Sequence, residues 1–119
     1  MDYLYAILEK IKNRPELYIG KKSIRKLADF INGYMCAIFE ITGEKVFFGN
    51  FKLYVEYKTG ISHPGQHWSD ILSNNKSQEE AFDLFYIYLE EFKVLVKDEN
   101  DLKQLLQMHQ KKCLDNMFK

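Results

Sequence analysis

The chain has 119 residues, which suits one domain because two independent cores would each receive only about 60 residues. Apolar residues make up 46% and charged residues 29% of the chain, a balance that is typical of globular proteins and excludes a disordered chain. Seventeen Lys and Arg residues balance seventeen Asp and Glu residues, so the basic excess that is typical of a general nucleic-acid-binding protein is missing.

The first half of the chain predicts two helices separated by a loop. An amphipathic helix starts near the N-terminus and ends where Pro15 disfavours helical geometry in the residue before it. Residues 13–22 predict a loop in which Gly20 takes a positive φ angle. A long helix follows between a Ser23 cap and a stop at Gly43. Its apolar stripe consists of Ile24, Leu27, Ala28, Ile31, Met35, Ile38 and Phe39.

The second half predicts three further helices and one ambiguous segment. Residues 46–58 fit both a helical and a strand periodicity. A loop follows, and then a short helix at 68–72. Residues 77–80 form a capping box at the start of a helix whose apolar face is Ala81, Phe82, Phe85, Tyr88, Leu89, Phe92 and Leu95. After a break at 98–101, a terminal amphipathic helix completes the chain.

The pattern therefore predicts an all-α fold. We expect a compact single-domain bundle of about five or six helices over residues 1–119, with minor strand content near residues 46–58 as the open alternative.

Processing signals and cysteines indicate the compartment. The N-terminus lacks the basic and long apolar regions of a signal peptide, and no stretch approaches the roughly 18 uninterrupted apolar residues of a membrane span. Cys36 and Cys113 form no CxxC pair, which excludes a disulfide framework and a four-cysteine zinc site. We expect both to be buried free thiols, in a cytoplasmic protein without a membrane partner.

The most distinctive short motif is RPELYIG at residues 14–20. It resembles a seven-residue stretch near the start of type II topoisomerase ATPase subunits, but the chain has no room for that ATPase domain and no glycine-rich phosphate loop. We therefore interpret the motif, with Arg14 at its start, as structural. Pro15 fixes a turn, Tyr18 packs on the core, and Gly20 lets the chain re-enter a helix.

The same motif belongs to a second resemblance, which covers nearly the whole chain. The chain is similar to a family of small, mostly uncharacterised bacterial proteins with an Arg-Pro-x-x-Tyr-x-Gly turn, a Phe/Leu-x-x-Gly-Tyr step (residues 30–34 here) and an aromatic segment (48–57). The family then has a Gly-Trp step, where this chain places His67 before Trp68, and an Ala-Phe-x-Leu-Phe run (81–85). The resemblance implies an all-helical fold. Some members resemble immunity proteins of contact-dependent or secreted polymorphic toxin systems.

Candidate catalytic and metal-binding groups are few. His63 and His67 have a zinc-like spacing, but a proline and a glycine between them prevent a rigid helical pair, and no third ligand lies nearby in sequence. Neither cysteine lies beside a base. The adjacent carboxylates Glu79-Glu80 and Glu90-Glu91 point about 100° apart on a helix. We therefore predict a protein that is not an enzyme and has no metal and no cofactor.

Charge is segregated along the chain although it sums to zero. Residues 10–26 hold seven basic residues against one Glu, and residues 79–101 hold eight acids against two Lys. Such runs are usually solvated helix faces. The functional interpretation is a surface of two signs that steers a charged protein partner.

The leading hypothesis is a non-catalytic binding protein: a bacterial immunity protein that neutralises a cognate toxin domain. A nuclease is one class of toxin that fits this hypothesis. An acidic helix face could then occupy a basic substrate cleft. The candidate partner-binding residues are Glu79, Glu80, Asp83, Glu90 and Glu91. The alternative is a small nucleic-acid-binding or regulatory module that uses the basic segment 10–26, although no recognisable nucleic-acid-binding motif supports it.

Overall fold

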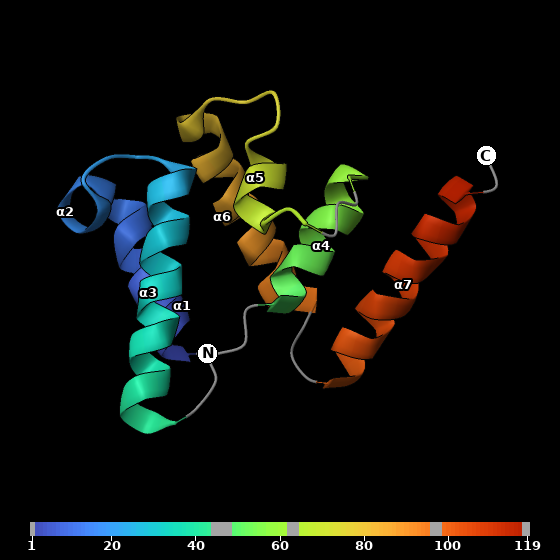
Figure 1. The fold of residues 1–119 in the computed structure, drawn as a ribbon, viewed down its shortest axis with the longest axis horizontal. Coiled ribbons are helices and arrows are strands. Elements are labelled where there is room, and N and C mark those ends of the chain that lie inside the picture. The colour runs from blue at the N-terminus through green and yellow to red at the C-terminus, as the bar shows by residue number, and fades with distance from the viewer. Residues whose placement is uncertain (1, 44–48, 62–64, 96–98, 118–119) are drawn as a thin grey trace.

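The fold is built from helices. The computed structural model describes residues 2–43, 49–61, 65–95 and 99–117, and these residues contain seven helices and no strand (Figure 1). In chain order the helices are α1 (Asp2–Asn13), α2 (Pro15–Ile19), α3 (Ile24–Thr42), α4 (Gly49–Thr59), α5 (Trp68–Leu72), α6 (Gln78–Leu95) and α7 (Glu99–Met117). The all-α prediction is confirmed, and residues 49–58 of the ambiguous segment are helical. Residues 46–48 lie outside the described residues.

The helix beyond the expected five or six is α2, which lies where the sequence predicts a loop over residues 13–22. Pro15 occupies the first turn of α2, where proline is tolerated because its missing N–H would have no partner within the helix. A proline that ends one helix therefore also begins the next. Gly20 follows α2 with a φ of 85°, as predicted.

The prediction that Tyr18 packs on the core is wrong. Its side chain is 37% exposed. Within α2, the buried Pro15 and the half-buried Ile19 lie one turn apart and take the side that faces the protein. Tyr18 is therefore left at the surface.

Helix α3 begins and ends as the sequence predicts. The Ser23 hydroxyl accepts a hydrogen bond from the Lys26 amide at 3.3 Å. At the other end, Gly43 has a φ of 72° and its N–H donates to the Phe39 carbonyl at 2.8 Å. These two caps satisfy backbone groups that a helix terminus otherwise leaves without partners.

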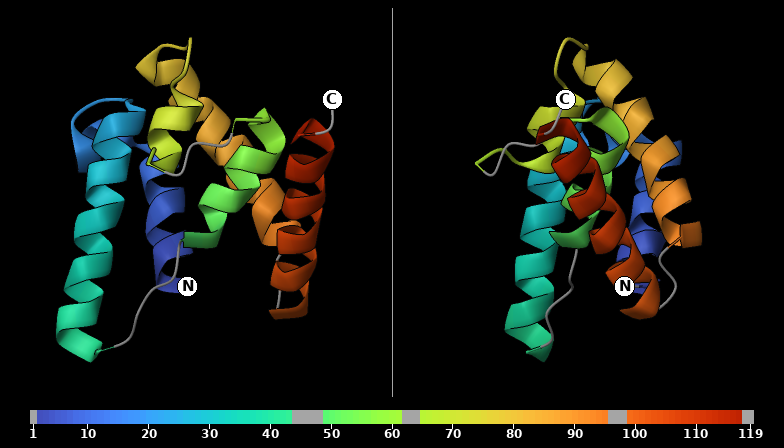
Figure 2. Two further views of the ribbon diagram at one scale, coloured as in Figure 1. Left: turned by 45° about the vertical axis from the view of Figure 1, so that its right-hand side comes forward. Right: turned by 90° about the vertical axis from the view of Figure 1, so that its right-hand side faces the viewer.

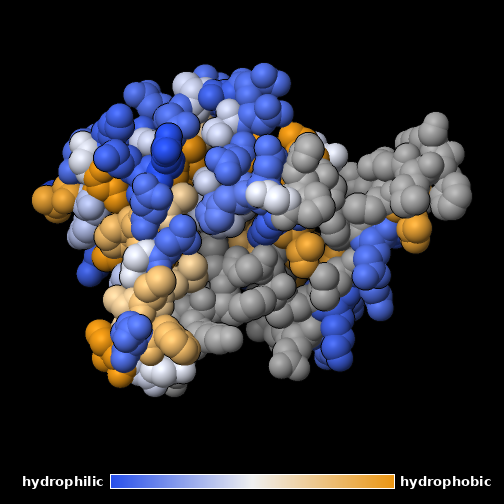
Figure 3. Space-filling view, in the orientation of Figure 1, coloured by the Kyte–Doolittle hydropathy of each residue, from blue (hydrophilic) through white to orange (hydrophobic). Residues whose placement is uncertain are grey.

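The apolar stripe of α3 extends further than the core that it packs against. Ile31 is fully buried, but Phe39, at the end of the stripe, is 47% exposed, and apolar side chains gather over the lower part of α3 in Figure 3. Cys36 lies in the same half of the helix and is exposed, so the prediction of a buried thiol is wrong for this residue. The side chain of Cys113 lies outside the described part of the chain.

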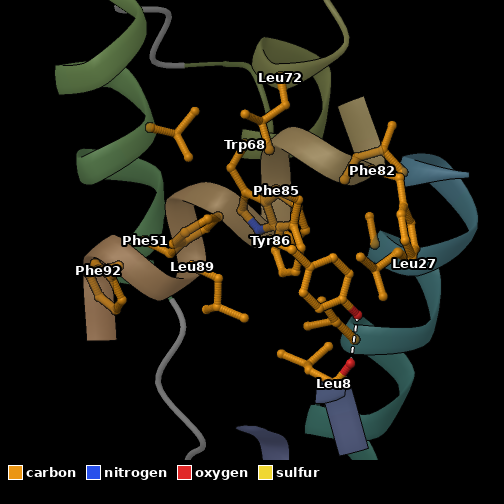
Figure 4. Close-up of a cluster of buried hydrophobic side chains, with 14 of the residues drawn as sticks. Leu8, Leu27, Phe51, Trp68, Leu72, Phe82, Phe85, Tyr86, Leu89 and Phe92 are labelled. Atoms are coloured by element: carbon orange, nitrogen blue, oxygen red, sulfur yellow. Dashed lines mark hydrogen bonds between the residues drawn. The ribbon is translucent and has the colours of Figure 1, made fainter. Parts of the chain in front are cut away.

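The centre of the core is aromatic (Figure 4). Phe51 of α4 makes edge-to-face contacts with Trp68 of α5 and with Phe85 and Phe92 of α6, at ring-centroid distances of 5.5, 5.3 and 5.6 Å respectively. Each ring buries a large apolar area, and edge-to-face geometry adds a favourable quadrupole term. The three helices are thereby held around one side chain.

Polar contacts connect α6 to the N-terminal helices. The buried Tyr86 hydroxyl donates to the Leu8 carbonyl of α1 at 2.7 Å (Figure 4). The side-chain oxygen of Gln78 accepts hydrogen bonds from the Ser23 hydroxyl at 3.1 Å and from the Arg25 amide at 3.0 Å. The start of α6 is thus fixed to the start of α3.

The helices form three groups (Figures 1 and 2). Helices α1, α2 and α3 lie on one side, α4, α5 and α6 lie in the middle, and α7 packs mainly against α4 on the other side. One hydrophobic cluster contains buried residues from every helix except α2. Helix α7 contributes Leu105 to it.

No helix in the described ranges is both long enough and apolar enough to cross a lipid bilayer.

Candidate functional site

The five candidate acids all lie on α6, outside its buried side. Glu79, Glu80, Asp83 and Glu90 are exposed, and Glu91 is half-buried. The same side of the helix carries two exposed aliphatic residues, Ile87 (56%) and Val94 (68%). We call this surface the outer face of α6, and it consists of Glu79, Glu80, Asp83, Ile87, Glu90, Glu91 and Val94.

The helical repeat explains why these residues share a face. Successive residues are rotated by about 100°, so the buried Phe82, Phe85, Leu89 and Phe92 define one side and the outer face lies opposite. In the right-hand view of Figure 2, α6 runs along an edge of the molecule, which leaves this side open to solvent.

The first turn of α6 has a local reason to be acidic. The Glu80 amide donates to the Ser77 hydroxyl at 3.0 Å, which is the serine half of the predicted capping box. Carboxylates at this end also interact favourably with the helix dipole. Within the described ranges, neither Glu79 nor Glu80 forms an ion pair, so both charges face solvent.

Asp83 is paired with a residue of the basic segment. The Lys22 ammonium lies 2.7 Å from one oxygen of Asp83 and 2.9 Å from the other. It also lies 5.8 Å from the centre of the Phe82 ring. The side chains of Lys22 and Asp83 are 37% and 60% exposed, and ion pairs this exposed contribute little to stability.

Glu91 differs from the other acids because it is bound to the core. Its carboxylate accepts a hydrogen bond from the hydroxyl of the buried Tyr54, and the Lys58 ammonium lies 3.3 Å away. The Tyr54 hydrogen bond, with Lys58 nearby, lowers the pKa of Glu91. Burial, together with the Glu91 carboxylate, raises the pKa of Tyr54. Glu91 therefore has a structural role in addition to any role at the surface.

A mixed-charge groove borders the outer face on its α1 and α2 side. It has a volume of about 740 Å³. Its aromatic residues are Phe82 and Tyr86, and the Lys12 ammonium lies 5.9 Å from the centre of the Tyr86 ring. The groove is lined by Lys12, Asn13, Pro15, Glu16, Lys22, Phe82, Asp83, Tyr86, Ile87 and Glu90. It brings the basic segment and the acidic helix, which are far apart in sequence, onto one surface.

A second, more apolar groove borders the outer face on its α4 side. It has a volume of about 480 Å³ and is lined by Tyr54, Lys58, Glu90, Glu91, Val94 and Leu95. Glu90 lines both grooves and forms an ion pair of 3.4 Å with Lys93, one turn further along the helix. The two grooves therefore flank the outer face along α6.

The residues for which the sequence predicts a structural role lie partly at the surface and partly in the core. They are Arg14, Pro15, Tyr18, Gly20 and Trp68. Arg14 precedes α2 and is exposed, whereas Pro15 is buried and lines the mixed-charge groove. Trp68 is 5% exposed and stacks on Phe85 at 5.1 Å, so it belongs to the core. Tyr18 and Gly20 are both exposed.

His67 has a local structural role. Its Nδ1 accepts a hydrogen bond from the Ser69 amide at 3.2 Å and caps α5. Burial lowers the pKa of His67 because a buried imidazole favours the neutral form. His63 lies outside the described residues. In the described part of the chain, no group of three or more His, Cys, Asp or Glu side chains is arranged to hold a metal ion.

Ile87 and Val94 were not among the candidates from sequence, although the sequence contains a signal for them. They lie seven residues apart, and both fall outside the stripe of buried residues. Leu95, which the pattern assigns to the core, is 48% exposed. Helical phase alone therefore predicts that Ile87 and Val94 lie on the outer face together with the acids.

No protein-family model, curated protein or solved structure matched this chain.

Proposed function

We propose that this protein is a non-catalytic binding protein that neutralises a cognate toxin domain, in the manner of a bacterial immunity protein. It binds through the outer face of α6. The observation that supports this proposal most is the composition of that face: five acids surround two exposed aliphatic side chains, Ile87 and Val94.

This composition suits a basic protein partner. Exposed carboxylates attract a positively charged surface and accelerate association. Apolar side chains that become buried at the centre of an interface supply most of the affinity. A nuclease toxin presents a basic cleft for its substrate, so an acidic helix face could cover that cleft and exclude the nucleic acid.

The resemblance to small helical bacterial proteins supports the same proposal. It rests on the RPELYIG motif at residues 14–20 and on the aromatic and Ala-Phe-x-Leu-Phe segments that follow. Some members of that family resemble immunity proteins that lie beside contact-dependent or secreted polymorphic toxins. A cytoplasmic location is part of the proposal.

The second candidate is a nucleic-acid-binding or regulatory module that uses the basic segment 10–26. One observation favours it, because Lys10, Arg14, Lys21, Arg25 and Lys26 are exposed. Two observations weaken it. Lys22 is paired with Asp83, and Lys12 lies over the Tyr86 ring, so both are engaged with α6.

The test is charge reversal on α6, measured against the protein encoded by the neighbouring gene. The Asp83→Lys/Glu90→Lys double variant should keep its fold, because both side chains are exposed and surface ion pairs contribute little. Association should slow by about tenfold or more at low salt and become less dependent on salt. Rates and affinities at low and high salt provide the readout.

The matched control is Asp29→Lys/Glu40→Lys on α3. Both residues are exposed, and the change in net charge is the same, so a general charge effect would appear in both variants. Binding that is unchanged in the folded α6 variant would contradict the proposal. Binding of a DNA or RNA duplex that is lost on neutralising Arg14 and Lys21 would favour the second candidate.

A further inference from the structure

The outer face of α6 has a regular internal spacing. Glu80, Asp83, Ile87, Glu90 and Val94 follow one another at intervals of three, four, three and four residues. This spacing places the five side chains along one side of the helix, where three acids are interspersed with two aliphatic residues. The stripe points to solvent, opposite the buried Phe85 and Leu89, and it therefore exposes two aliphatic side chains among acids.

The aliphatic residues occupy equivalent positions in this spacing. Ile87 and Val94 are both β-branched and lie seven residues apart, or about 10 Å along the helix axis. They are 56% and 68% exposed. This separation equals two helical turns, so the two apolar side chains match the seven-residue repeat of a second helix that runs alongside.

The flanking grooves provide space for the side chains of such a helix. The mixed-charge groove reaches Ile87 and Glu90, and the more apolar groove reaches Glu90 and Val94. Side chains that project from either edge of a helix placed along α6 would therefore lie over these two shallow grooves.

The charges beside the stripe specify the edges of the partner helix. Glu79 lies next to the stripe on one side and Glu91 lies next to it on the other, by their helical phase. Hydrogen bonds or ion pairs hold Asp83 and Glu91 in place from within the protein, so these carboxylates are partly oriented before a partner arrives. Lys or Arg side chains at the edges of the partner helix complement this arrangement.

We infer that the element that docks on α6 is an amphipathic α-helix with an aliphatic stripe and basic edges. The inference rests on the proposed function for its partner, which is the toxin domain, and adds the secondary structure and side-chain pattern of the contacting segment. The binding mode is helix-on-helix packing, in which the partner helix runs along α6 and its two edges lie over the two grooves.

The probe is a fluorescent synthetic peptide of about 18 residues, which is about 27 Å of helix. It carries Leu at three- and four-residue spacing and Lys at the flanking positions. A scrambled peptide of identical composition, with Leu distributed around all sides, is the control. Fluorescence anisotropy should give an affinity for the patterned peptide about tenfold or more above that for the scrambled one.

The variant that tests the stripe is Ile87→Ser/Val94→Ser, which should weaken binding of the patterned peptide by about tenfold. Leu17→Ser/Ile41→Ser is the matched control, because these residues are 69% and 81% exposed and lie on α2 and α3. The affinity of this control variant for the patterned peptide should lie within about twofold of that of the unchanged protein. Equal binding of both peptides, or full binding by the α6 serine variant, would overturn the inference.

The same serine variants, measured with the neighbouring-gene protein, separate this inference from the proposed function. One outcome is that the neighbouring-gene protein depends on Asp83 and Glu90 for binding and still binds the α6 serine variant with unchanged affinity. In that case the helix inference fails and the proposed function stands. If the patterned peptide binds as expected and the neighbouring-gene protein does not bind, the proposed partner is wrong and the helix-docking surface stands.

Discussion

His67 is a single residue whose protonation is connected to helix formation. Its Nδ1 accepts from the Ser69 amide and lies 2.7 Å from the Ser69 hydroxyl. A ring nitrogen can accept a hydrogen bond from an amide only when it carries no proton. Protonation of His67 therefore removes the cap of α5, the short helix that begins with Trp68 and contributes it to the core.

This arrangement predicts a loss of stability at mildly acidic pH. The pKa of His67 in the folded protein lies below its ordinary value of 6.5, so the unfolded chain takes up the proton first as the pH falls. The free energy of unfolding should be highest above pH 6.5, decrease as the pH falls through 6.5, and level off, for this group, below the folded-state pKa.

The measurement is urea unfolding across this pH range for the wild-type protein and for His67→Asn. Asparagine keeps a side-chain acceptor at the N-cap and does not titrate. The variant should therefore show a smaller decrease than the wild type between neutral and mildly acidic pH. Parallel curves for the two proteins would show that another group is responsible.

At the scale of elements, α2 contains both a buried and an exposed residue of the RPELYIG motif. Pro15 is buried against the protein, and Tyr18 on the same short helix is 37% exposed. Motif residues therefore differ in what they contribute to the fold, although they are only three positions apart.

Replacement of Tyr18 by Ala should accordingly change the free energy of unfolding by less than about 1 kcal/mol. Replacement of Phe51, which is fully buried, should cost about 3–5 kcal/mol because it leaves a cavity in the aromatic centre. Denaturant unfolding of both variants gives the comparison. A loss of several kcal/mol for Tyr18→Ala would mean that the ring packs more closely than its exposure indicates.

Among the longer helices, α6 has a part in both the core and the candidate site. Its inner side supplies Phe82, Phe85, Leu89 and Phe92 to the core, and its outer face carries the acids. The inner side is therefore needed for folding, whereas most side chains of the outer face are exposed and contribute little to stability. Glu91 is the exception, because the buried Tyr54 is hydrogen-bonded to it, whereas Asp83 and Glu90 form only exposed ion pairs.

At the scale of the whole molecule, one core connects the helices. The hydrophobic cluster includes buried residues from α1, α3, α4, α5, α6 and α7. Phe51 contacts rings from α5 and α6, and Tyr86 of α6 is hydrogen-bonded to α1. No group of these helices could unfold without exposing apolar surface of the others.

This connection predicts a single unfolding transition. Trp68 is the only tryptophan of the chain and lies in the core, so its fluorescence reports tertiary packing, and far-UV circular dichroism reports total helix. The two signals should have the same midpoint in a denaturant titration. Separate midpoints would mean that part of the helical structure survives the loss of the aromatic core.

The sequence by itself determined the helices that have strong periodicity and clear caps. The Ser23 cap, the Gly43 stop and the Ser77 cap follow from side-chain and backbone preferences that act over a few residues. Periodicity also placed the candidate acids on one side of the helix that begins after Ser77. These properties are local, so one sequence suffices to predict them.

Tertiary structure decided everything that depends on which surfaces meet. The apolar stripe of α3 gave no indication that Phe39 would be exposed, and no local pattern pairs Lys22 with Asp83, which are 61 residues apart. Pro15 is compatible both with the end of one helix and with the start of another, so its own preferences do not determine that residues 15–19 form a helix. Exposure, ion pairing and the two grooves arise from packing between distant segments, and periodicity along a single helix carries no information about that packing.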